Sequence, residues 1–181
     1  MKTLVLVFHP NLSASRVNQR WAEEMEKQDG VTLHYVYEAY PDEKIDVAAE
    51  QRLLEQHDRI VLQFPFYWYS SPSLLKKWED AVLTYGWAFG SEGDKLQGKE
   101  LLIATSTGVA IEGYSPEGTV GYTVPELLRP LQATSDLIGT SYLTPYVLYG
   151  APLLSDEGIE QSAKDYVSYA LKPKLDLLAV R

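Results

Sequence analysis

The sequence predicts a three-layer α/β domain, with a five-stranded parallel sheet between two layers of helices. Short runs rich in valine, isoleucine and leucine alternate with longer amphipathic segments, which is the pattern of βαβ units around a buried sheet. No internal repeat or block of like charges marks a linker. The length of 181 residues suits a single domain, and we expect residues 1–181 to form it.

The apolar runs predict the strands and the amphipathic segments between them predict the helices. The expected strands are Thr3–Phe8, Val31–Tyr37, Arg59–Phe64, Glu100–Thr105 and Tyr142–Leu148. The expected helices are Arg16–Gln28, Ile45–His57, Ser73–Tyr85, Pro125–Leu137 and Asp156–Leu178.

Local signals mark the ends of several of these elements. The first strand ends at His9-Pro10, and the first helix follows serines that can cap it and stops before Asp29-Gly30. Pro72 stands at the entrance of the third helix, where its missing N–H costs little. The following LLKKWEDAVL is amphipathic, so Trp78 is expected in the core or at an interface.

Right-handed crossovers leave few arrangements for such a chain, and the flavodoxin-like order 2-1-3-4-5 is the most common for five strands. Ligands of that fold bind at the carboxyl ends of strands one, three and four. The loops 9–15, 65–72 and 106–122 are therefore expected to form the site. The central strands are expected to contribute Leu4, Leu6, Val61, Leu62, Leu101 and Ile103 to the core.

The composition excludes several classes of function. Sixteen Lys and Arg against 25 Asp and Glu give a net charge of −9, which argues against a surface that binds nucleic acid or an anionic membrane. Any phosphate must therefore bind at a site where the local potential is positive. The chain has no cysteine and three histidines, so we expect no metal site. The five apolar residues from Leu4 to Phe8 are too short for a signal peptide or a membrane span. We expect a cytoplasmic protein.

The first loop, HPNLSASRVN, offers hydroxyls and a guanidinium at the start of a helix. The N–H groups and dipole of a helix N-terminus favour an anion, and Ser13, Ser15 and Arg16 would add donors to a phosphate. Alternatively a serine only caps the helix, Arg16 is solvated and His9 fixes the turn. The loop lacks the acidic residues of a response regulator and the glycines and lysine of a P-loop.

The second loop, FPFYWYSSP, contains five aromatic residues in six positions: Phe64, Phe66, Tyr67, Trp68 and Tyr69. An apolar loop at a strand end suits a large planar ligand, because rings can pack on its face and backbone groups can meet its polar edge. The alternatives are an oligomer interface and a local packing cluster.

The third loop, STGVAIEGYSPEGTVGY, places Thr107 and Gly108 directly after the fourth strand. Small residues let the backbone approach the edge of a ring. Tyr114, between Gly113 and Ser115, is expected at the tip of a movable lid, although so many glycines can also make a loop mobile without a function. The long segment at 84–100 is expected to expose Trp87 and Phe89 at a functional or interfacial surface.

His34 and His57 fall in a strand and at a helix end, and we expect no functional role for either. The acidic residues form no close pair in a candidate loop, so paired-carboxylate catalysis has no support.

Together the motifs HP…S-S-R-V-N, FPFYWYSSPSLLKKWEDAVLTYGWAFG, GKELL, STG and RPLQAT closely resemble those of the flavodoxin-like NAD(P)H:quinone oxidoreductases. The resemblance is greatest to the bacterial branch that contains the ancillary oxidoreductase subunits of glutathione-gated potassium efflux systems. It extends from about Leu4 to the C-terminal helix. It implies a cytoplasmic homodimeric flavoprotein with its active site at the subunit interface.

The resemblance also implies roles for individual residues. The flavin phosphate and ribityl chain would contact His9, Ser15, Arg16, Val17 and Asn18, and the ring would contact Phe66, Tyr67, Trp68, Tyr69, Ser106, Thr107, Gly108 and Val109. Tyr114 matches the active-site tyrosine of the family and is the catalytic candidate. Two positions depart from the family: the usual Thr-Thr-Gly-Gly reads Ser-Thr-Gly-Val, and the relay histidine of the animal enzymes aligns with Val120.

The implied function is two-electron reduction of quinones or related acceptors by NAD(P)H, in a ping-pong hydride transfer on FMN, with FAD as the alternative cofactor. N–H groups near Thr107 to Val109 would stabilise the reduced flavin. An alternative is a regulatory subunit that docks on a potassium efflux transporter at the inner face of the membrane, with incidental turnover. A one-electron flavodoxin carrier fits less well, because it would not need the aromatic segment at 85–98.

Overall fold

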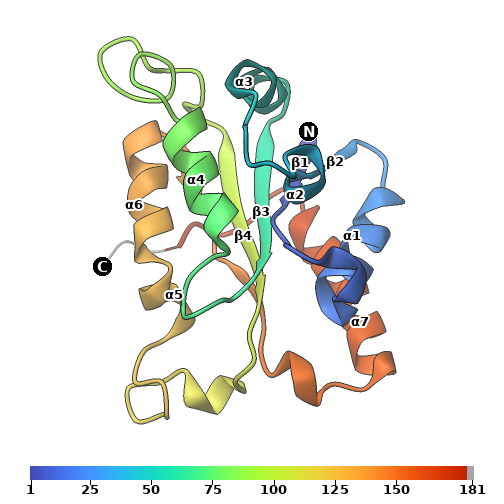
Figure 1. Ribbon diagram of the computed structural model, residues 1–181. Helices are drawn as coiled ribbons and strands as arrows, with labels where there is room; N and C mark the ends of the chain where they lie inside the picture. The colour runs from blue at the N-terminus through green and yellow to red at the C-terminus, as the bar shows by residue number, and fades with distance from the viewer. Residues whose placement is uncertain (179–181) are drawn as a thin grey trace.

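The computed structural model describes residues 1–178 and shows a parallel sheet with helices on both faces (Figure 1). The strands are β1 Thr3–Val7, β2 Val31–Tyr35, β3 Arg59–Pro65, β4 Glu100–Ser106, β5 Ser141–Tyr142 and β6 Tyr146–Leu148. The helices are α1 Arg16–Glu26, α2 Val36–Ala39, α3 Val47–Glu55, α4 Ser73–Val82, α5 Val124–Leu127, α6 Arg129–Ile138 and α7 Asp156–Ala170.

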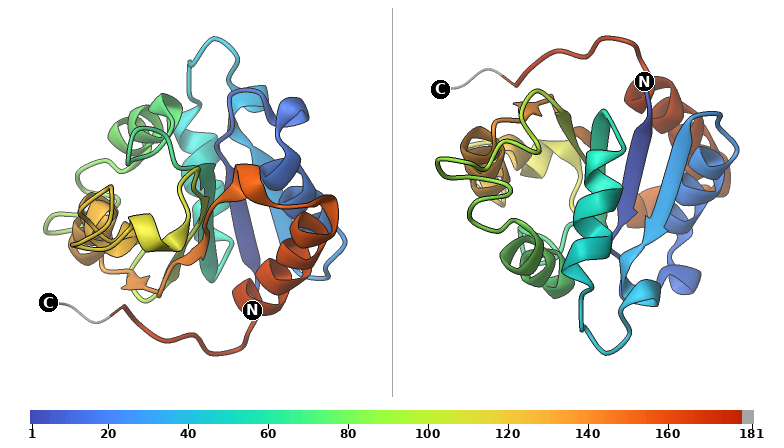
Figure 2. Two further views of the ribbon diagram at one scale, coloured as in Figure 1. Left: turned by 90° about the horizontal axis from the view of Figure 1, so that it is seen from below. Right: turned by 90° about the horizontal axis from the view of Figure 1, so that it is seen from above.

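The strands lie in the order β2-β1-β3-β4-β5, and β6 also pairs with β4. Every pairing between these strands is parallel. The flavodoxin-like order 2-1-3-4-5 predicted from the sequence is therefore confirmed. The loops after β1, β3, β4 and β6 lie at one edge of the sheet, which faces the viewer in the left panel of Figure 2.

Successive residues of each central strand point to opposite faces and build two cores. Leu4 and Leu6 of β1 pack on the side of α3, α4 and α6, whereas Val5 and Val7 pack on the side of α1 and α7 (Figure 1). The six predicted core residues, Leu4, Leu6, Val61, Leu62, Leu101 and Ile103, are all buried. Trp78, in α4, is buried in the first of these two cores.

Two predicted elements are divided at prolines. The strand Tyr142–Leu148 is two short strands, because Pro145 has no N–H to donate to a ladder; β5 pairs with the start of β4 and β6 with its end. The helix Pro125–Leu137 is also two, because Pro130 cannot continue the hydrogen bonds of α5, and the break falls at Leu128.

The last predicted helix, Asp156–Leu178, is too long by eight residues. It ends at Ala170, shortly before Pro173, a residue type that disfavours helical backbone in the residue preceding it. The chain then runs extended along β5: the Leu178 N–H donates to the Tyr142 carbonyl, at 3.0 Å. The same segment passes the N-terminus in the right panel of Figure 2.

The second predicted strand is too long as well. It ends at Tyr35, and Val36–Ala39 forms the short helix α2. Val36 is fully buried in the core on the α3 and α4 side, so the turn that begins there places an apolar side chain out of water. Among residues 1–178 no helix combines the length and apolar character needed to cross a membrane.

Candidate functional site

A groove with about 280 Å³ of space lies at the carboxyl ends of β1, β3 and β4. Its walls are His9, Ala14, Ser15, Arg16, Val17, Asn18, Pro65, Tyr67, Ser106, Ala151 and Pro152. Seven of these were predicted from the sequence as cofactor contacts. Phe66, Trp68, Tyr69, Thr107, Gly108 and Val109 lie in the same loops but not in the walls of this groove.

One wall of the groove is the N-terminal turn of α1. Ser15 is its N-cap, since the Ser15 Oγ accepts the Asn18 N–H at 3.0 Å. The N–H groups of Arg16 and Val17 have no acceptor within the helix, and its first turn contains no acidic residue. The turn therefore combines free donors with the positive end of the helix dipole, as an anion requires.

The Arg16 guanidinium has other partners in this structure. Its Nη2 lies 2.7 Å from an Asp156 carboxylate oxygen and 3.2 Å from the Leu154 carbonyl oxygen. The side chains of Arg16 and Asp156 are 52% and 92% exposed, so this ion pair contributes little to stability. An anion in the groove can compete for Arg16 at low cost.

His9 presents a neutral ring to the groove. Burial lowers the pKa of its imidazole from the ordinary value. Its Nδ1 accepts the Asn11 N–H at 3.1 Å, so the proton of the neutral ring lies on Nε2. His9 is therefore a hydrogen-bond donor at neutral pH, and its ring also contacts Tyr67 edge-on.

The aromatic loop after β3 forms a tight turn. Tyr67 and Ser70 exchange two backbone hydrogen bonds, of 3.0 and 2.9 Å. The two residues between them have positive φ, 48° at Trp68 and 61° at Tyr69, as in a type I′ turn, which normally requires glycine or asparagine. Trp68 is 93% exposed. Trp68 thus has a strained backbone conformation, and its side chain lies in solvent.

The loop after β4 is joined to the loop after β6. The Thr107 N–H donates to the Leu148 carbonyl at 2.8 Å, and the Ala151 N–H donates to the Thr107 carbonyl at 2.9 Å. The N–H of Thr107 is thus occupied. The N–H groups of Gly108 and Val109 have no acceptor among the described residues, and a Cβ at Gly108 would meet nothing within 4 Å, so there is free space beside this backbone.

Tyr114 lies inside the protein. It is only 7% exposed, and its ring contacts Phe66 and Tyr149, with ring centres 6.2 and 5.7 Å away. Burial raises the pKa of its phenol, while a hydrogen bond with the Thr107 side chain acts in the opposite direction. The expectation of a side chain at the tip of a lid is wrong, because these contacts hold the ring in the core.

The sequence analysis missed the loop 149–152. Ala151 and Pro152 line the groove, and Tyr149 packs on Tyr114. The signal was available: the motif YGAP directly follows a predicted strand, and the carboxyl ends of all parallel strands meet at one edge. Gly150 supports the turn there with a φ of 65°.

The segment at 84–100 does not expose the two aromatic residues expected there. Trp87 and Phe89 are half-buried against the core on the α4 side, and the Trp87 Nε1 donates to a Glu55 carboxylate oxygen at 2.8 Å. The exposed ring is Tyr85, at 71%. Trp87 and Phe89 therefore bury part of their surface against their own chain.

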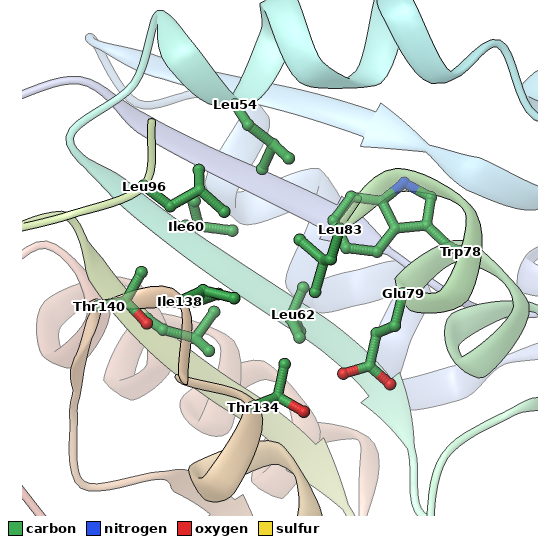
Figure 3. Close-up of a pocket in the computed structure, with 11 residues that line it drawn as sticks. Leu54, Ile60, Leu62, Trp78, Glu79, Leu83, Leu96, Thr134, Ile138 and Thr140 are labelled. Carbon is green, nitrogen blue, oxygen red and sulfur yellow. The ribbon is translucent and has the colours of Figure 1, made fainter. Parts of the chain in front are cut away.

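A narrow apolar cavity between α4, α6 and the sheet contains none of the predicted site residues (Figure 3). It has room for about one water molecule, so it cannot hold a large planar ligand. Glu79 lies at its margin, and burial raises the pKa of this carboxyl to about 7. In the part of the chain that the structure describes, no group of three or more histidine and acidic side chains could bind a metal ion.

Comparison with known proteins agrees with the geometry. A family model described as flavodoxin-like fold matches residues 1–170. The chain belongs to this family. General stress protein 14 of Bacillus subtilis (strain 168) is 57% identical over 173 residues, covering 96% of this chain and 99% of that protein. An uncharacterized NAD(P)H oxidoreductase of the same organism, YrkL, is 50% identical, covering 93% and 97%.

Three solved structures are also similar over nearly their whole length. A Treponema denticola general stress protein 14 in complex with FMN has a TM-score of 0.90 and 42% identity, covering 94% of this chain and 98% of that one. An NADPH-quinone reductase of P. pentosaceus has a TM-score of 0.87 and 34% identity, covering 96% and 100%. A protein from Streptomycin violaceusniger described as a tryptophan halogenase has a TM-score of 0.93 and 51% identity, covering 94% and 99%.

Proposed function

We propose that this protein is a flavin-dependent NAD(P)H oxidoreductase that binds FMN in the groove and reduces quinones or related two-electron acceptors. The observation that carries the proposal is the groove itself, in which the free N–H groups of a helix N-terminus, an arginine and a neutral histidine lie beside an aromatic turn. The FMN complex of the 42% identical relative and the oxidoreductase names of others support it.

The residues present fit FMN. The N-terminal turn of α1 and Arg16 would hold the phosphate, and the Asn18 Oδ1, which is buried without a partner among the described residues, can accept a ribityl hydroxyl. The open backbone at Gly108 and the ring of Tyr67 would border the isoalloxazine. When bound, FMN would supply the two-electron hydride chemistry that links a nicotinamide donor to the acceptor.

The chain itself would orient the reactants and exclude water. The N–H groups of Gly108 and Val109 would stabilise negative charge at the ring edge, because they are fixed before the reaction. Tyr114, held by Phe66 and Tyr149, would limit the depth of the pocket and donate a hydrogen bond from a neutral phenol. The nicotinamide and the acceptor would occupy the same face in turn, which gives ping-pong kinetics.

We also propose that the protein works as a homodimer. Tyr67, Trp68, Tyr69, Tyr85 and Tyr122 are all at least 40% exposed, and they would be covered in part by a second copy. Sedimentation should show a dimer at micromolar concentration, and a monomer would contradict this. Trp68→Ala should weaken the dimer, whereas Trp87→Ala should act mainly on the stability of the single chain.

A regulatory role on a membrane transporter is the second candidate function. It is favoured by a relative in Enterobacter sp. (strain 638), named as an ancillary protein of a glutathione-regulated potassium-efflux system, which is 38% identical over 163 residues. Copurification of this chain with a potassium transporter would support that role. Full quinone turnover without such a partner would favour the enzyme.

Spectroscopy and a turnover assay test the proposed function. The purified protein should be yellow, release one FMN per chain, and oxidise NADH or NADPH only when a quinone is added. A colourless protein that binds neither FMN nor FAD would overturn the proposal. Incubation with tryptophan, chloride, reductant and dioxygen as the oxidant is the control for the halogenase named above, and a chlorinated product would replace quinone reduction as the activity.

A further inference from the structure

Gln63, near the end of β3, is a buried polar residue that the candidate site does not yet explain. It is 0% exposed and lies on the face of the sheet that otherwise packs Val5, Val61 and Leu102 against α1 and α7. A buried amide costs free energy unless it is hydrogen-bonded. The Gln63 Oε1 has no partner among the described residues, so the bond made by Nε2 is what indicates why an amide is found at this position.

The Gln63 side chain reaches the first turn of α1. Its Nε2 donates to the backbone carbonyl of Asn18 at 2.9 Å. The acceptor is a carbonyl oxygen, so the amide nitrogen must be the atom that faces it. Gln63 does not line the groove; it supports Asn18, which does.

Asn18 connects three parts of the site. Its N–H donates to the Ser15 cap at 3.0 Å, its Nδ2 donates to the Ser106 Oγ at 3.2 Å, and its carbonyl accepts from Gln63. Asn18 itself is only 2% exposed. The turn that offers its N–H groups to the groove is thereby joined to β3 and to the end of β4.

A second polar residue on the same face of β3, Arg59, makes hydrogen bonds with a purely structural role. Arg59, at the other end of the strand, donates to the carbonyls of Ala170 and Lys172 and so holds the end of α7. That end is remote from the groove. Gln63 makes the corresponding hydrogen bond at the opposite end of β3, where the groove lies. This bond holds the first turn of α1, which borders the groove.

We propose that Gln63 is a positioning residue for the phosphate of the bound flavin. By holding the Asn18 carbonyl it keeps the N-terminal turn of α1 at the distance from β3 and β4 at which its N–H groups meet that phosphate. Phosphate recognition by fixed backbone donors depends on this placement, since a shift of about 0.5 Å already weakens such a site. This inference rests on the proposed FMN site.

The test compares two flavins that differ only in the phosphate. FMN and riboflavin are titrated into the full-length protein after removal of bound flavin by dialysis, with flavin fluorescence as the readout. In Gln63→Leu the dissociation constant of FMN should rise by about tenfold, whereas that of riboflavin should change by less than about twofold. Gln63→Met keeps the length of the side chain but has no donor, and it should show the same selective loss.

Ser162→Ala is the matched control. Ser162 is buried and its Oγ accepts the Trp21 Nε1–H at 3.0 Å, so this variant also removes a buried bond to α1, one turn further along the helix. It should change the two dissociation constants by the same factor. An equal effect of Gln63→Leu on both flavins, or normal FMN selectivity in Gln63→Met if the leucine variant does not fold, would overturn the positioning role. A wild-type protein that binds neither flavin would overturn the proposed function itself.

Discussion

The two loops that build most of the groove are held in opposite ways. Around the start of α1, Ser15 caps the helix and Asn18 is bonded on three sides, with every residue at negative φ. In the turn after β3, Trp68 and Tyr69 are both at positive φ, and Glu43 is the only other described non-glycine residue in that state.

This contrast separates two ways of making a site. The helix start offers N–H donors that any sequence with a good cap would provide. The features that bind an anion there therefore do not cost the fold any stability. The aromatic turn costs stability, since left-handed backbone costs an L-residue about 1–2 kcal/mol, and its exposed tryptophan recovers none of that by burial. Strain of this kind is most often found where a ligand or partner is bound.

The largest expected effect is on the helix start. Replacing Ser15 and Arg16 together by alanine should weaken FMN binding by about 2–4 kcal/mol, because a cap and a charge-assisted bond to the phosphate are lost. Fluorescence titration measures it. Asp156→Asn is the control: it releases Arg16 from its partner and should leave affinity unchanged or improve it. Unchanged affinity in the double variant would place the phosphate elsewhere.

A smaller effect is expected behind the aromatic turn, at Tyr114. Tyr114→Phe keeps the ring contacts with Phe66 and Tyr149 and removes only the phenolic hydroxyl. Quinone turnover should fall by no more than about tenfold, which is about 1.4 kcal/mol, with unchanged flavin content. Steady-state kinetics and the absorbance of bound flavin measure both. A thousandfold loss would show an essential acid, and loss of flavin would place Tyr114 in the cofactor site.

The strain in the aromatic turn can be measured with two substitutions at one position. Trp68→Ala and Trp68→Gly both remove the exposed ring, but only glycine relieves the positive φ. Chemical denaturation should therefore show the glycine variant to be more stable than the alanine variant by about 1 kcal/mol. Equal stabilities would mean that the turn is unstrained, and the contrast with the helix start would disappear.

The smallest expected effect is a pH dependence at His9, between the two loops. Burial lowers the pKa of this imidazole in the folded protein, so the unfolded chain binds more protons around pH 6.5 and below. His9 therefore stabilises the fold above its unfolded pKa, and this stability is lost as the pH falls through the folded value. His9→Gln should flatten the slope of unfolding free energy against pH below about 6.5. An unchanged slope would contradict a half-buried, neutral His9.

Much of the fold could be predicted from the sequence. The alternation of apolar runs and amphipathic segments, with the handedness of crossovers, gave the strand order, and strand period gave the buried residues such as Leu4 and Ile103. Three errors in the predicted elements have local causes at Pro130, Pro145 and Pro173, whereas the second strand ends early where Val36 enters the core. Each proline was visible in the sequence, and giving more weight to its missing N–H would have divided or shortened the element.

Part of the candidate site was also predictable, because the carboxyl ends of parallel strands must meet at one edge. Seven predicted residues therefore line one groove, and the same argument applied to the last strand would have found Ala151 and Pro152.

The tertiary structure alone decided which partners these residues have. The ion pair of Arg16 with Asp156 and the bond of Gln63 to Asn18 join residues 140 and 45 positions apart, and the burial of Tyr114 and Trp87 depends on rings and carboxylates from other elements. Sequence pattern states which face of an element is apolar. It does not state which side chain of a distant element meets a given atom, because that depends on how the helices pack on the finished sheet.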